Sequence, residues 1–441
     1  DMEIKELNND GLTIRLAFHF VAEDYAEGRK KILNRIRRNA DIKGFRKGMA
    51  PASLIEKAHG GEALVESINT LISENLNKYI EENKLSIIGE PLPVEDDEKK
   101  NTFANGEEFD FTFDIALAPK FDVSLSAEDK IAYYTVPANE TEKEAYKKNI
   151  YKQFSKLETC DAVKDGDFLI ADFIQGDRKV ENSYISTTVL PEEGKALFIG
   201  KKAGDEFDID VVAVFNNETD RAAMLKMKKE ELAETAPVWH LVVKEVKNYV
   251  DAVPGQELYD QMFGKDVVKT EEEFNAEIEK RLVEELKQES DYRFMLDARK
   301  YLIDKANIAL PEDFLKRWLF TANEGKFTME EIEKDFPLFL QDFRWQSIAN
   351  KIITDNKLEI NRESIKAEAI KLAQYQFAMY GIANAPADQL ENFAEMILKD
   401  EKQSRRLFEK AEETAVLAFL RGVVTLENKE ISSEELRKMN N

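Results

Sequence analysis

The spacing of hydrophobic residues changes along the first part of the chain. Residues 12–18 and 108–115 alternate apolar and polar positions, which is the period of a strand with one buried face. Between these stretches, residues 23–38 predict a helix, and apolar positions three and four residues apart predict another over residues 64–80. Together these elements predict an α+β domain over residues 1–121.

The rest of the chain divides into three stretches with different patterns. Residues 122–163 contain a short extended piece and a polar helical stretch, which we interpret as a linker or arm. Residues 164–248 are rich in strand signals, and residues 249–441 follow the helical period almost throughout. The strand signals lie at residues 167–174, 206–214 and 238–246. The helical signals are capping boxes beginning at Thr270 and Ser432 and helix entries at Pro311 and Pro386.

These patterns predict an α+β multidomain protein. Its expected parts are an α+β N-terminal domain, a β-rich middle domain and an extended all-α C-terminal domain. Hydrophobic residues make up 43% of the chain and charged residues 34%, with a formal net charge of -24, which is typical of a folded and highly solvated protein. Charges interrupt every apolar run well before the roughly 20 residues that a bilayer span needs, so we expect no membrane segment.

The first residues and the cysteine content suggest a compartment. Residues 2–7 are charged and lack the apolar stretch of a secretory signal. The single cysteine, Cys160, excludes an internal disulfide framework and fits a reducing environment. We therefore expect a cytoplasmic protein.

The charge of the chain is unevenly distributed. Residues 29–47 hold nine basic side chains and one acidic side chain, so this segment is +8 while the remainder sums to -32. Such a segment is able to approach polyanionic RNA although the body of the protein is repelled from it. A solvated helix face is the alternative, because basic helix faces are common.

A loop after the basic helix favours a binding role. Gly44, Gly48 and Pro51 indicate a tight exposed turn, and Phe45 places a large apolar ring among cations. A phenylalanine is usually buried. In this setting its ring is suited to enter a pocket on a partner while the cations pair with phosphate or carboxylate.

The pattern Gly44-Phe45-Arg46-x-Gly48-x-x-Pro51 resembles the ribosome-docking signature of the bacterial trigger factor family. The basic helix, residues 54–60 and residues 87–91 are also similar to the N-terminal domain of that family. The resemblance implies docking at the nascent-chain exit of the large ribosomal subunit, with contacts to ribosomal protein and RNA near the exit tunnel. Met49 stands where a basic residue is common in the family. The residues implicated by the loop and the helix are Gly44, Phe45, Arg46, Lys47, Gly48, Pro51, Arg35, Arg37 and Arg38.

The middle domain resembles the FKBP-type peptidyl-prolyl isomerase domain of the same family, most clearly at residues 200–207. Such an isomerase needs a dry aromatic pocket that favours the twisted amide rather than an acid–base pair. Where the family has small and aromatic residues, this chain has Glu192 and Glu193. We interpret the pocket as degenerate and expect isomerase activity to be weak or absent. The pocket residues implicated are Phe173, Leu190, Pro191 and Trp239, of which Phe173 and Trp239 are expected to be core residues.

No other pattern in the chain indicates catalysis. The three histidines are far apart, no Cys/His cluster has metal-ligand spacing, and no phosphate-binding loop is complete. We therefore expect no catalytic residue, no metal and no cofactor.

The helical region is similar to the C-terminal domain of the family, which implies a helical body whose arms form a cradle. Methionine and aromatic side chains suit adaptable contacts with unfolded chains, although at helical spacing most of them are expected to be core residues. The candidates are Met295, Met329, Met379, Met396, Phe327, Phe336, Phe339, Trp345, Phe377 and Phe393.

The sequence thus predicts an ATP-independent molecular chaperone that docks at the ribosome exit and shields or assists the folding of new polypeptides. Its expected partners are the large ribosomal subunit and unfolded or nascent chains, and the resemblance allows a homodimer away from the ribosome. The alternative is a peptidyl-prolyl isomerase acting on unfolded proteins, which residues 190–194 disfavour. An extracytoplasmic holdase or a nucleic-acid adaptor is a third class, disfavoured by the absent export signal and by the loop.

Overall fold

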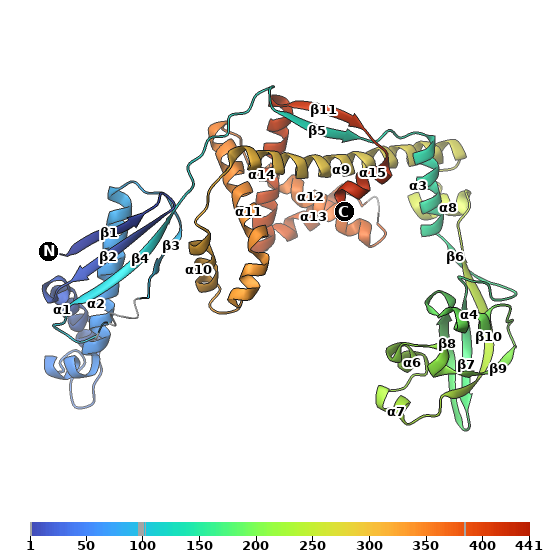
Figure 1. Ribbon diagram of the computed structural model, residues 1–441, viewed down its shortest axis with the longest axis horizontal. Helices are drawn as coiled ribbons and strands as arrows, with labels where there is room; N and C mark the ends of the chain where they lie inside the picture. The colour runs from blue at the N-terminus through green and yellow to red at the C-terminus, as the bar shows by residue number, and fades with distance from the viewer. Residues whose placement is uncertain (1, 96–100, 102, 383–384) are drawn as a thin grey trace. The chain divides into compact units, whose positions relative to one another are not determined.

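The computed structural model describes the chain except residues 1, 96–100, 102 and 383–384 (Figure 1). The chain forms two compact units, each assembled from three stretches of sequence. The first unit comprises Asp1–Ala132, Met295–Glu368 and Lys399–Glu427, and the second comprises Tyr133–Phe294, Ala369–Leu398 and Asn428–Asn441. Both units therefore include part of the helical C-terminal region.

The first unit contains a four-stranded antiparallel sheet with the order β1-β2-β4-β3. In β2, the buried residues Ile14, Leu16, Phe18 and Phe20 occupy every second position, because successive side chains point to opposite faces. The strands are β1 (Glu3–Asn9), β2 (Thr13–Phe20), β3 (Ile87–Pro93) and β4 (Phe109–Leu117). The two strands predicted from alternating positions are confirmed as β2 and β4.

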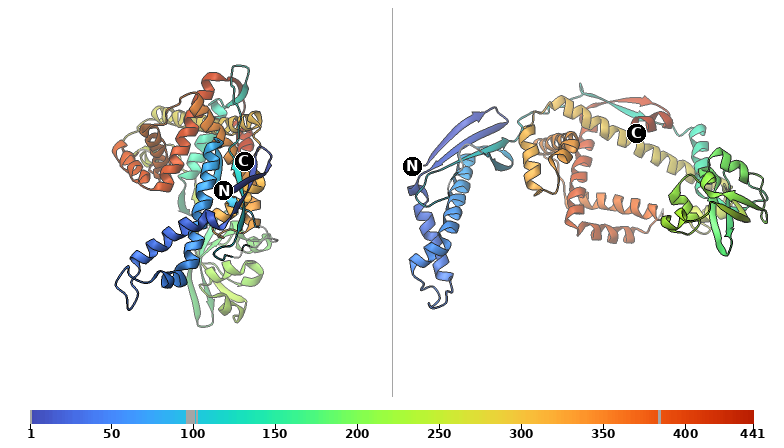
Figure 2. Two further views of the ribbon diagram at one scale, coloured as in Figure 1. Left: turned by 90° about the vertical axis from the view of Figure 1, so that its left-hand side faces the viewer. Right: turned by 60° about the horizontal axis from the view of Figure 1, so that its bottom comes forward.

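Two helices, α1 (Ala22–Asn39) and α2 (Ala52–Glu82), form a hairpin beside this sheet. On α2, Leu64, Ile68 and Leu76 are buried in one core with the strands, as their three- and four-residue spacing predicted. In each view of Figures 1 and 2 the loop between α1 and α2 lies at the end of the hairpin that extends away from the strands. The sheet therefore anchors one end of α2 and leaves the other end free to present the loop.

Helices from the C-terminal region complete the first unit. They are α10 (Glu312–Ala322), α11 (Met329–Asp355), α14 (Glu401–Val423), the C-terminal part of α9 (Glu271–Ala306) and the N-terminal part of α12 (Arg362–Met379). Buried Asp114 of β4 accepts hydrogen bonds from Arg15 (2.8 Å) and from Arg317 of α10 (2.6 Å). At Gly89 of β3, a Cβ atom would lie only 2.5 Å from the Nε1 atom of Trp318. Ion pairing and close packing together hold α10 on the sheet.

A second buried carboxylate, Asp129, connects the segment after β4 to α9. The Tyr301 hydroxyl (2.6 Å), the Lys305 ammonium (2.5 Å) and the Ser126 backbone N–H (2.8 Å) all donate to it. Burial alone would raise the pKa of Asp129, but these donors outweigh burial and lower the pKa to about 2. The carboxylate therefore stays charged in the folded protein.

The second unit contains a β-rich part built on a sheet with the order β6-β10-β7-β8, and β9 pairs with β10. The strands are β6 (Lys156–Thr159), β7 (Phe168–Gln175), β8 (Arg178–Ser186), β9 (Glu206–Asp210) and β10 (Val238–Val250). Short helical turns cover the sheet, namely η1 (Thr187–Val189), α4 (Glu192–Phe198), α5 (Val211–Val214), α6 (Glu218–Met224) and α7 (Lys229–Ala233). The strand predicted over residues 206–214 is wrong after Asp210. The Asp210 carboxylate accepts the backbone N–H groups of Val212 (2.9 Å) and Ala213 (3.1 Å), which starts α5 instead.

Helices make up the remainder of the second unit. They are α3 (Glu140–Gln153), α8 (Gln256–Phe263), the N-terminal part of α9, the C-terminal part of α12 (Arg362–Met379), α13 (Ala387–Leu398) and α15 (Ser433–Asn440). Ile150 of α3 is buried in a core with Leu258 of α8 and Phe274 of α9. The stretch predicted as a linker thus contains a helix that packs against its neighbours. Across the described residues, no helix has an apolar segment long enough to cross a membrane.

One strand interrupts the helical C-terminal region. β11 (Thr425–Glu430) pairs with β5 (Lys130–Thr135), and Thr425 donates its backbone N–H to the carbonyl of Asp129 (2.9 Å). The prediction of an all-α region is wrong at this point. Most residues of β11 are polar and exposed, so no alternating pattern marks it, and its partner strand is distant in sequence.

Replacing Asp129 with asparagine is expected to lower the free energy of unfolding by about 2 kcal/mol at pH 7, because Lys305 loses a largely desolvated charged partner. The folded pKa of about 2 lies below the ordinary value of 3.8, so the carboxylate stabilises the fold above pH 3.8. That contribution is lost as the pH falls toward 2. Urea unfolding followed by tryptophan fluorescence should therefore show a larger difference at pH 7 than at pH 3.

Exposed Asp122 provides a matched control for this measurement. Asp122→Asn should change the free energy of unfolding by less than about 0.5 kcal/mol at either pH. Equal effects of the two substitutions would contradict the role assigned to Asp129.

Candidate functional site

The loop between α1 and α2 is a compact turn held by its own backbone. Phe45 donates its N–H to the carbonyl of Ile42 (3.0 Å), and Gly48 donates to the carbonyl of Ala40 at the end of α1 (3.2 Å). Pro51, with φ -59°, then caps the start of α2. These bonds fix the positions at which the loop presents its side chains.

The two glycines of the loop are required by its backbone. Gly44 and Gly48 have φ values of 97° and 81°, a left-handed conformation that is costly for any residue with a Cβ atom. At Gly48 a Cβ atom would also lie 3.1 Å from the carbonyl oxygen of Arg38. The spacing of glycines in the sequence therefore reflects the geometry of the turn.

The tip of the loop presents apolar and cationic side chains to solvent. Phe45 is 41% exposed and Met49 is 65% exposed. Lys43, Arg46 and Lys47 are exposed, and no carboxylate among the described residues forms an ion pair with them. The loop therefore offers an aromatic ring, a flexible thioether and three cations to a partner.

The arginines of α1 do not share this exposure equally. Arg35 donates to both carboxylate oxygens of Glu66 on α2 (2.8 and 2.9 Å), and Arg37 donates to the carbonyl of Ala50 (2.6 Å). Both side chains thereby brace the hairpin. Arg38, by contrast, is exposed next to the loop.

Arg29 is buried between the two helices of the hairpin. It forms an ion pair with Glu56 and donates to the carbonyl of Gly60 (3.2 Å). A Cβ atom at Gly60 would lie 2.9 Å from the guanidinium, so glycine makes room for Arg29. Glu56 and Glu66 lie outside the basic segment, and nothing in the local sequence indicates that they neutralise part of it. The positive charge at the loop is therefore smaller than the segment total of +8 suggested.

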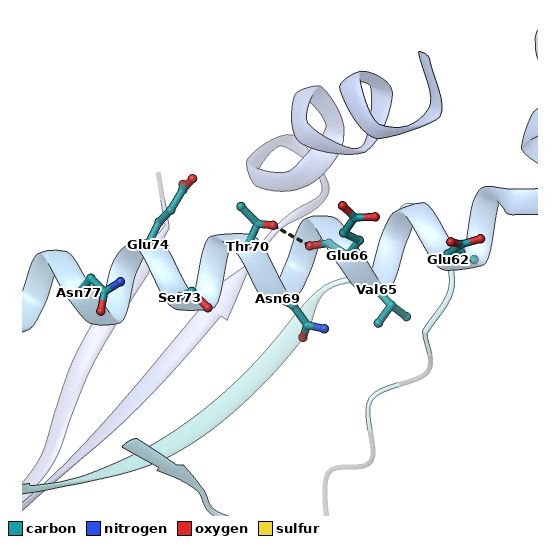
Figure 3. Close-up of a pocket in the computed structure, with 9 residues that line it drawn as sticks. Glu62, Val65, Glu66, Asn69, Thr70, Ser73, Glu74 and Asn77 are labelled. Atoms are coloured by element: carbon teal, nitrogen blue, oxygen red, sulfur yellow. Dashed lines mark hydrogen bonds between the residues drawn. The ribbon is translucent and has the colours of Figure 1, made fainter. Parts of the chain in front are cut away.

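A hollow of about 730 Å³ runs along the exposed face of α2 (Figure 3). Its lining is acidic or polar except at Val65 and Gly61, and the remaining residues are Glu62, Glu66, Asn69, Thr70, Ser73, Glu74 and Asn77. None of the loop residues predicted for docking lines this hollow. The hollow is therefore a separate surface whose charge is opposite to that of the loop.

Three of the four residues predicted for the isomerase pocket, Phe173, Leu190 and Trp239, belong to the core of the second unit. Phe173 and Trp239 are almost fully buried and meet edge to face, with their ring centroids 6.4 Å apart. Trp239 borders a cavity of about 290 Å³ together with Leu225. Leu225 is itself buried in the same core.

Leu190 and the fourth residue, Pro191, line a different cavity of about 940 Å³. Phe215 and Met224 contribute to the same cavity, and neither Phe173 nor Trp239 lines it. Leu190 therefore belongs both to the core and to the lining of this cavity, whereas the rings of Phe173 and Trp239 are packed in the core and do not line it.

The carboxylates after Pro191 have a different effect from the one inferred from the sequence. Glu192 begins α4 with a side chain that is 93% exposed, and Glu193 is also exposed. Neither carboxylate enters the cavity. Buried charge is therefore not what keeps a prolyl ring out, because the two predicted aromatic residues, Phe173 and Trp239, are themselves packed in the core.

Three family models match this chain, one each for its N-terminal, middle and C-terminal parts. Residues 2–150 match the family model "Bacterial trigger factor protein (TF)". Residues 157–251 match "Probable trigger factor, FKBP-like domain", and residues 290–440 match "Probable trigger factor, C-terminal domain".

Several curated proteins are similar to this chain over most of its length. A trigger factor from Treponema denticola is 23% identical over 93% of this chain and 95% of that protein. A trigger factor from Caldicellulosiruptor saccharolyticus is 25% identical, covering 94% and 93%, and one from Glaesserella parasuis is 26% identical, covering 82% and 85%. A solved structure of the trigger factor chaperone is 18% identical, covers 95% of this chain and 99% of the solved chain, and has a TM-score of 0.48.

The burial of Phe173 and Trp239 predicts little prolyl isomerase activity. With a short proline-containing peptide as substrate, the full chain should accelerate cis–trans exchange by less than about tenfold over the uncatalysed reaction, which takes tens to hundreds of seconds. The physical reason is that these two rings are packed in the core and are not open to receive a prolyl ring.

An active FKBP-type isomerase in the same assay serves as the positive control. Strong catalysis by this chain that disappears in Leu190→Ala would show that the cavity at Leu190 works as an isomerase site, and the pocket would then not be degenerate.

Proposed function

The chain belongs to the trigger factor family, and on that premise we propose that it acts as an ATP-independent chaperone that docks at the nascent-chain exit of the ribosome. There it shields new polypeptides or assists their folding. The observation that carries the proposal is the loop at residues 44–48, whose exposed ring and cations stand at the free end of a braced hairpin.

The chemistry of the loop supports separate roles for its side chains. Phe45 supplies a large apolar surface, which gains most when it enters a pocket on a protein partner. Arg46 and Lys47 supply cations for phosphate or carboxylate groups. We assign the first contact to ribosomal protein and the second to ribosomal RNA or acidic side chains near the exit tunnel.

The residues around the loop also have separate roles in docking. Gly44, Gly48 and Pro51 set the backbone of the turn. Arg35 and Arg37 form intramolecular bonds, so we assign them a bracing role in docking. Exposed Arg38 joins the cations that face the partner.

Unfolded clients need apolar surface that remains exposed. Among the candidate residues of the helical region, Phe336 and Trp345 are buried, whereas Phe327, Met379 and Met396 are exposed. Exposed methionine and aromatic side chains adapt to varied sequences at low cost. We propose that the exposed members contribute to client binding and that the buried members hold the helices together.

The prolyl isomerase alternative has weaker support, because the rings of Phe173 and Trp239 are packed in the core and do not line the cavity at Leu190 and Pro191. We place the chain in the cytoplasm, where ribosomes and nascent chains are. Away from the ribosome, the resemblance to the family allows a homodimer, which sedimentation of the purified chain will test.

Combined substitution of Phe45, Arg46 and Lys47 by alanine is expected to abolish co-sedimentation with empty 70S bacterial ribosomes at near-physiological salt. The wild-type chain should bind, and its affinity should fall as salt rises, because cation–phosphate contacts release counterions. The triple variant should lose at least tenfold in affinity while its thermal unfolding stays unchanged, since all three side chains are exposed.

The turn between α10 and α11 offers a matched control, because exposed Lys326 and Phe327 present the same chemistry elsewhere on the chain. The double alanine variant at these positions should bind empty ribosomes as the wild type does. If the loop variant and this control bind equally, the loop does not dock, and the chain should be tested as a chaperone that acts without ribosomes.

A further inference from the structure

α14 carries two adjacent carboxylates on the face that packs into the first unit. Glu412 and Glu413 are 7% and 5% exposed, and Ala411 and Val416 are buried on the same helix. α11 lies beside α14 (Figure 1), and the Gln346 side chain of α11 donates a hydrogen bond to Glu412 across the contact. A carboxylate is seldom buried in this way unless a cation or several donors accompany it.

The two carboxylates differ in their partners. Glu413 accepts hydrogen bonds from the Arg299 guanidinium of α9 and from the Lys410 ammonium (3.0 Å), so its charge is compensated. Within the part of the chain that the structure describes, the one side chain that donates to Glu412 is the neutral amide of Gln346, at 3.2 Å, and no cation forms an ion pair with it. Glu412 is therefore a buried acid whose ionised form lacks a counter-charge.

The other helices that pack against α14 do not supply this counter-charge. On α9, Arg299 is engaged by Glu413 and by the ring of Trp345, whose centroid lies 5.0 Å from the guanidinium. On α12, Glu368 accepts a hydrogen bond from the Thr414 hydroxyl (2.8 Å) and is itself an acid. The groups around this contact thus add negative charge or direct their positive charge to another carboxylate.

The ionised form of Glu412 is consequently the costly form. Burial raises the pKa of Glu412 above its ordinary value of 4.5, the hydrogen bond from Gln346 opposes this rise, and the charge of exposed Glu409 adds to it. A buried anion without a counter-charge is relieved either by taking up a proton or by gaining contact with water. Contact with water requires α14 to move away from α11 at this point.

We propose that Glu412 is a proton-operated switch in the contact between α11 and α14. With the proton bound, the neutral carboxyl group stays packed against Gln346 and the two helices are closed. When the carboxyl group releases its proton to water, the anion has no counter-charge, and the contact opens locally to hydrate it. The switch needs neither a ribosome nor an unfolded client, so it goes beyond the proposed function.

The direction of the pH dependence follows from the raised pKa. The contribution of Glu412 to closing is fully present below pH 4.5, its ordinary value, and is lost as the pH rises through the pKa of the folded protein. Within that window the opening equilibrium rises up to about tenfold per pH unit, because opening releases one proton. This dependence is opposite in sign to that of Asp129, whose contribution is lost as the pH falls.

The test is hydrogen–deuterium exchange of the full chain, followed by mass spectrometry between pH 5 and pH 8. Peptides that span residues 346 and 412 report on the contact, and a peptide from β7 reports on a distant element. Dividing each rate by that of an unstructured peptide removes the intrinsic effect of pH. In the wild type, protection of α11 and α14 should fall by at least about threefold across this range, and protection of β7 by less than about twofold.

Three substitutions separate the charge of Glu412 from its packing. Glu412→Gln keeps the shape and cannot ionise, so α11 and α14 should keep their protection at every pH. Gln346→Lys supplies the missing cation, so ionised Glu412 should stay closed and the fall with pH should disappear by the opposite chemistry. Glu409→Gln removes an exposed carboxylate from the same helix and is the matched control, which should retain the wild-type fall within about twofold.

Circular dichroism at pH 5 verifies that each variant is folded. If Glu412→Gln does not fold, Gln346→Lys carries the test, because the Gln346 side chain is partly exposed and tolerates a longer replacement. Constant protection of the wild type across the pH range overturns the inference, as does a fall of equal size in β7. A wild-type fall that persists in Glu412→Gln or in Gln346→Lys overturns it as well.

Discussion

The packing of α2 against β2 and β4 is the contact on which the presentation of the loop depends. Leu64, Ile68 and Leu76 bury one face of α2 in the sheet core, and this burial holds one end of a long helix. The other end extends past the sheet and carries the turn at Gly44. Arg29, held by Glu56, then ties α1 to α2, so the loop is carried by two connected helices rather than by one.

Buried carboxylates connect parts of the first unit that are distant in sequence. Asp114 on β4 holds Arg15 and Arg317, and Asp129 holds Tyr301 and Lys305. A buried carboxylate is costly unless donors surround it, and each of these has at least two. An arrangement of the helices that removed these donors would leave a buried carboxylate without partners, which is costly.

The β-rich part of the second unit keeps its sheet and core, although we expect little isomerase activity from it. The sheet and its aromatic core are intact, with Phe173 and Trp239 packed against one another. Leu225 and Met224 belong to that core, and Met224 and Leu190 also line the cavity of about 940 Å³. The two aromatic rings predicted for the isomerase pocket therefore serve to pack the sheet.

The sequence by itself determined the period of β2, β4 and the longer helices, the order of the parts and the loop, because these follow from local spacing and from turn-forming residues. Only the tertiary structure shows which cations of the basic segment are free of ion pairs and available to a partner. Arg35 and Arg29 are neutralised by Glu66 and Glu56 from another helix, a pairing with no local signature. It likewise decided that β11 pairs with β5, since this pairing depends on contacts between residues far apart in the chain.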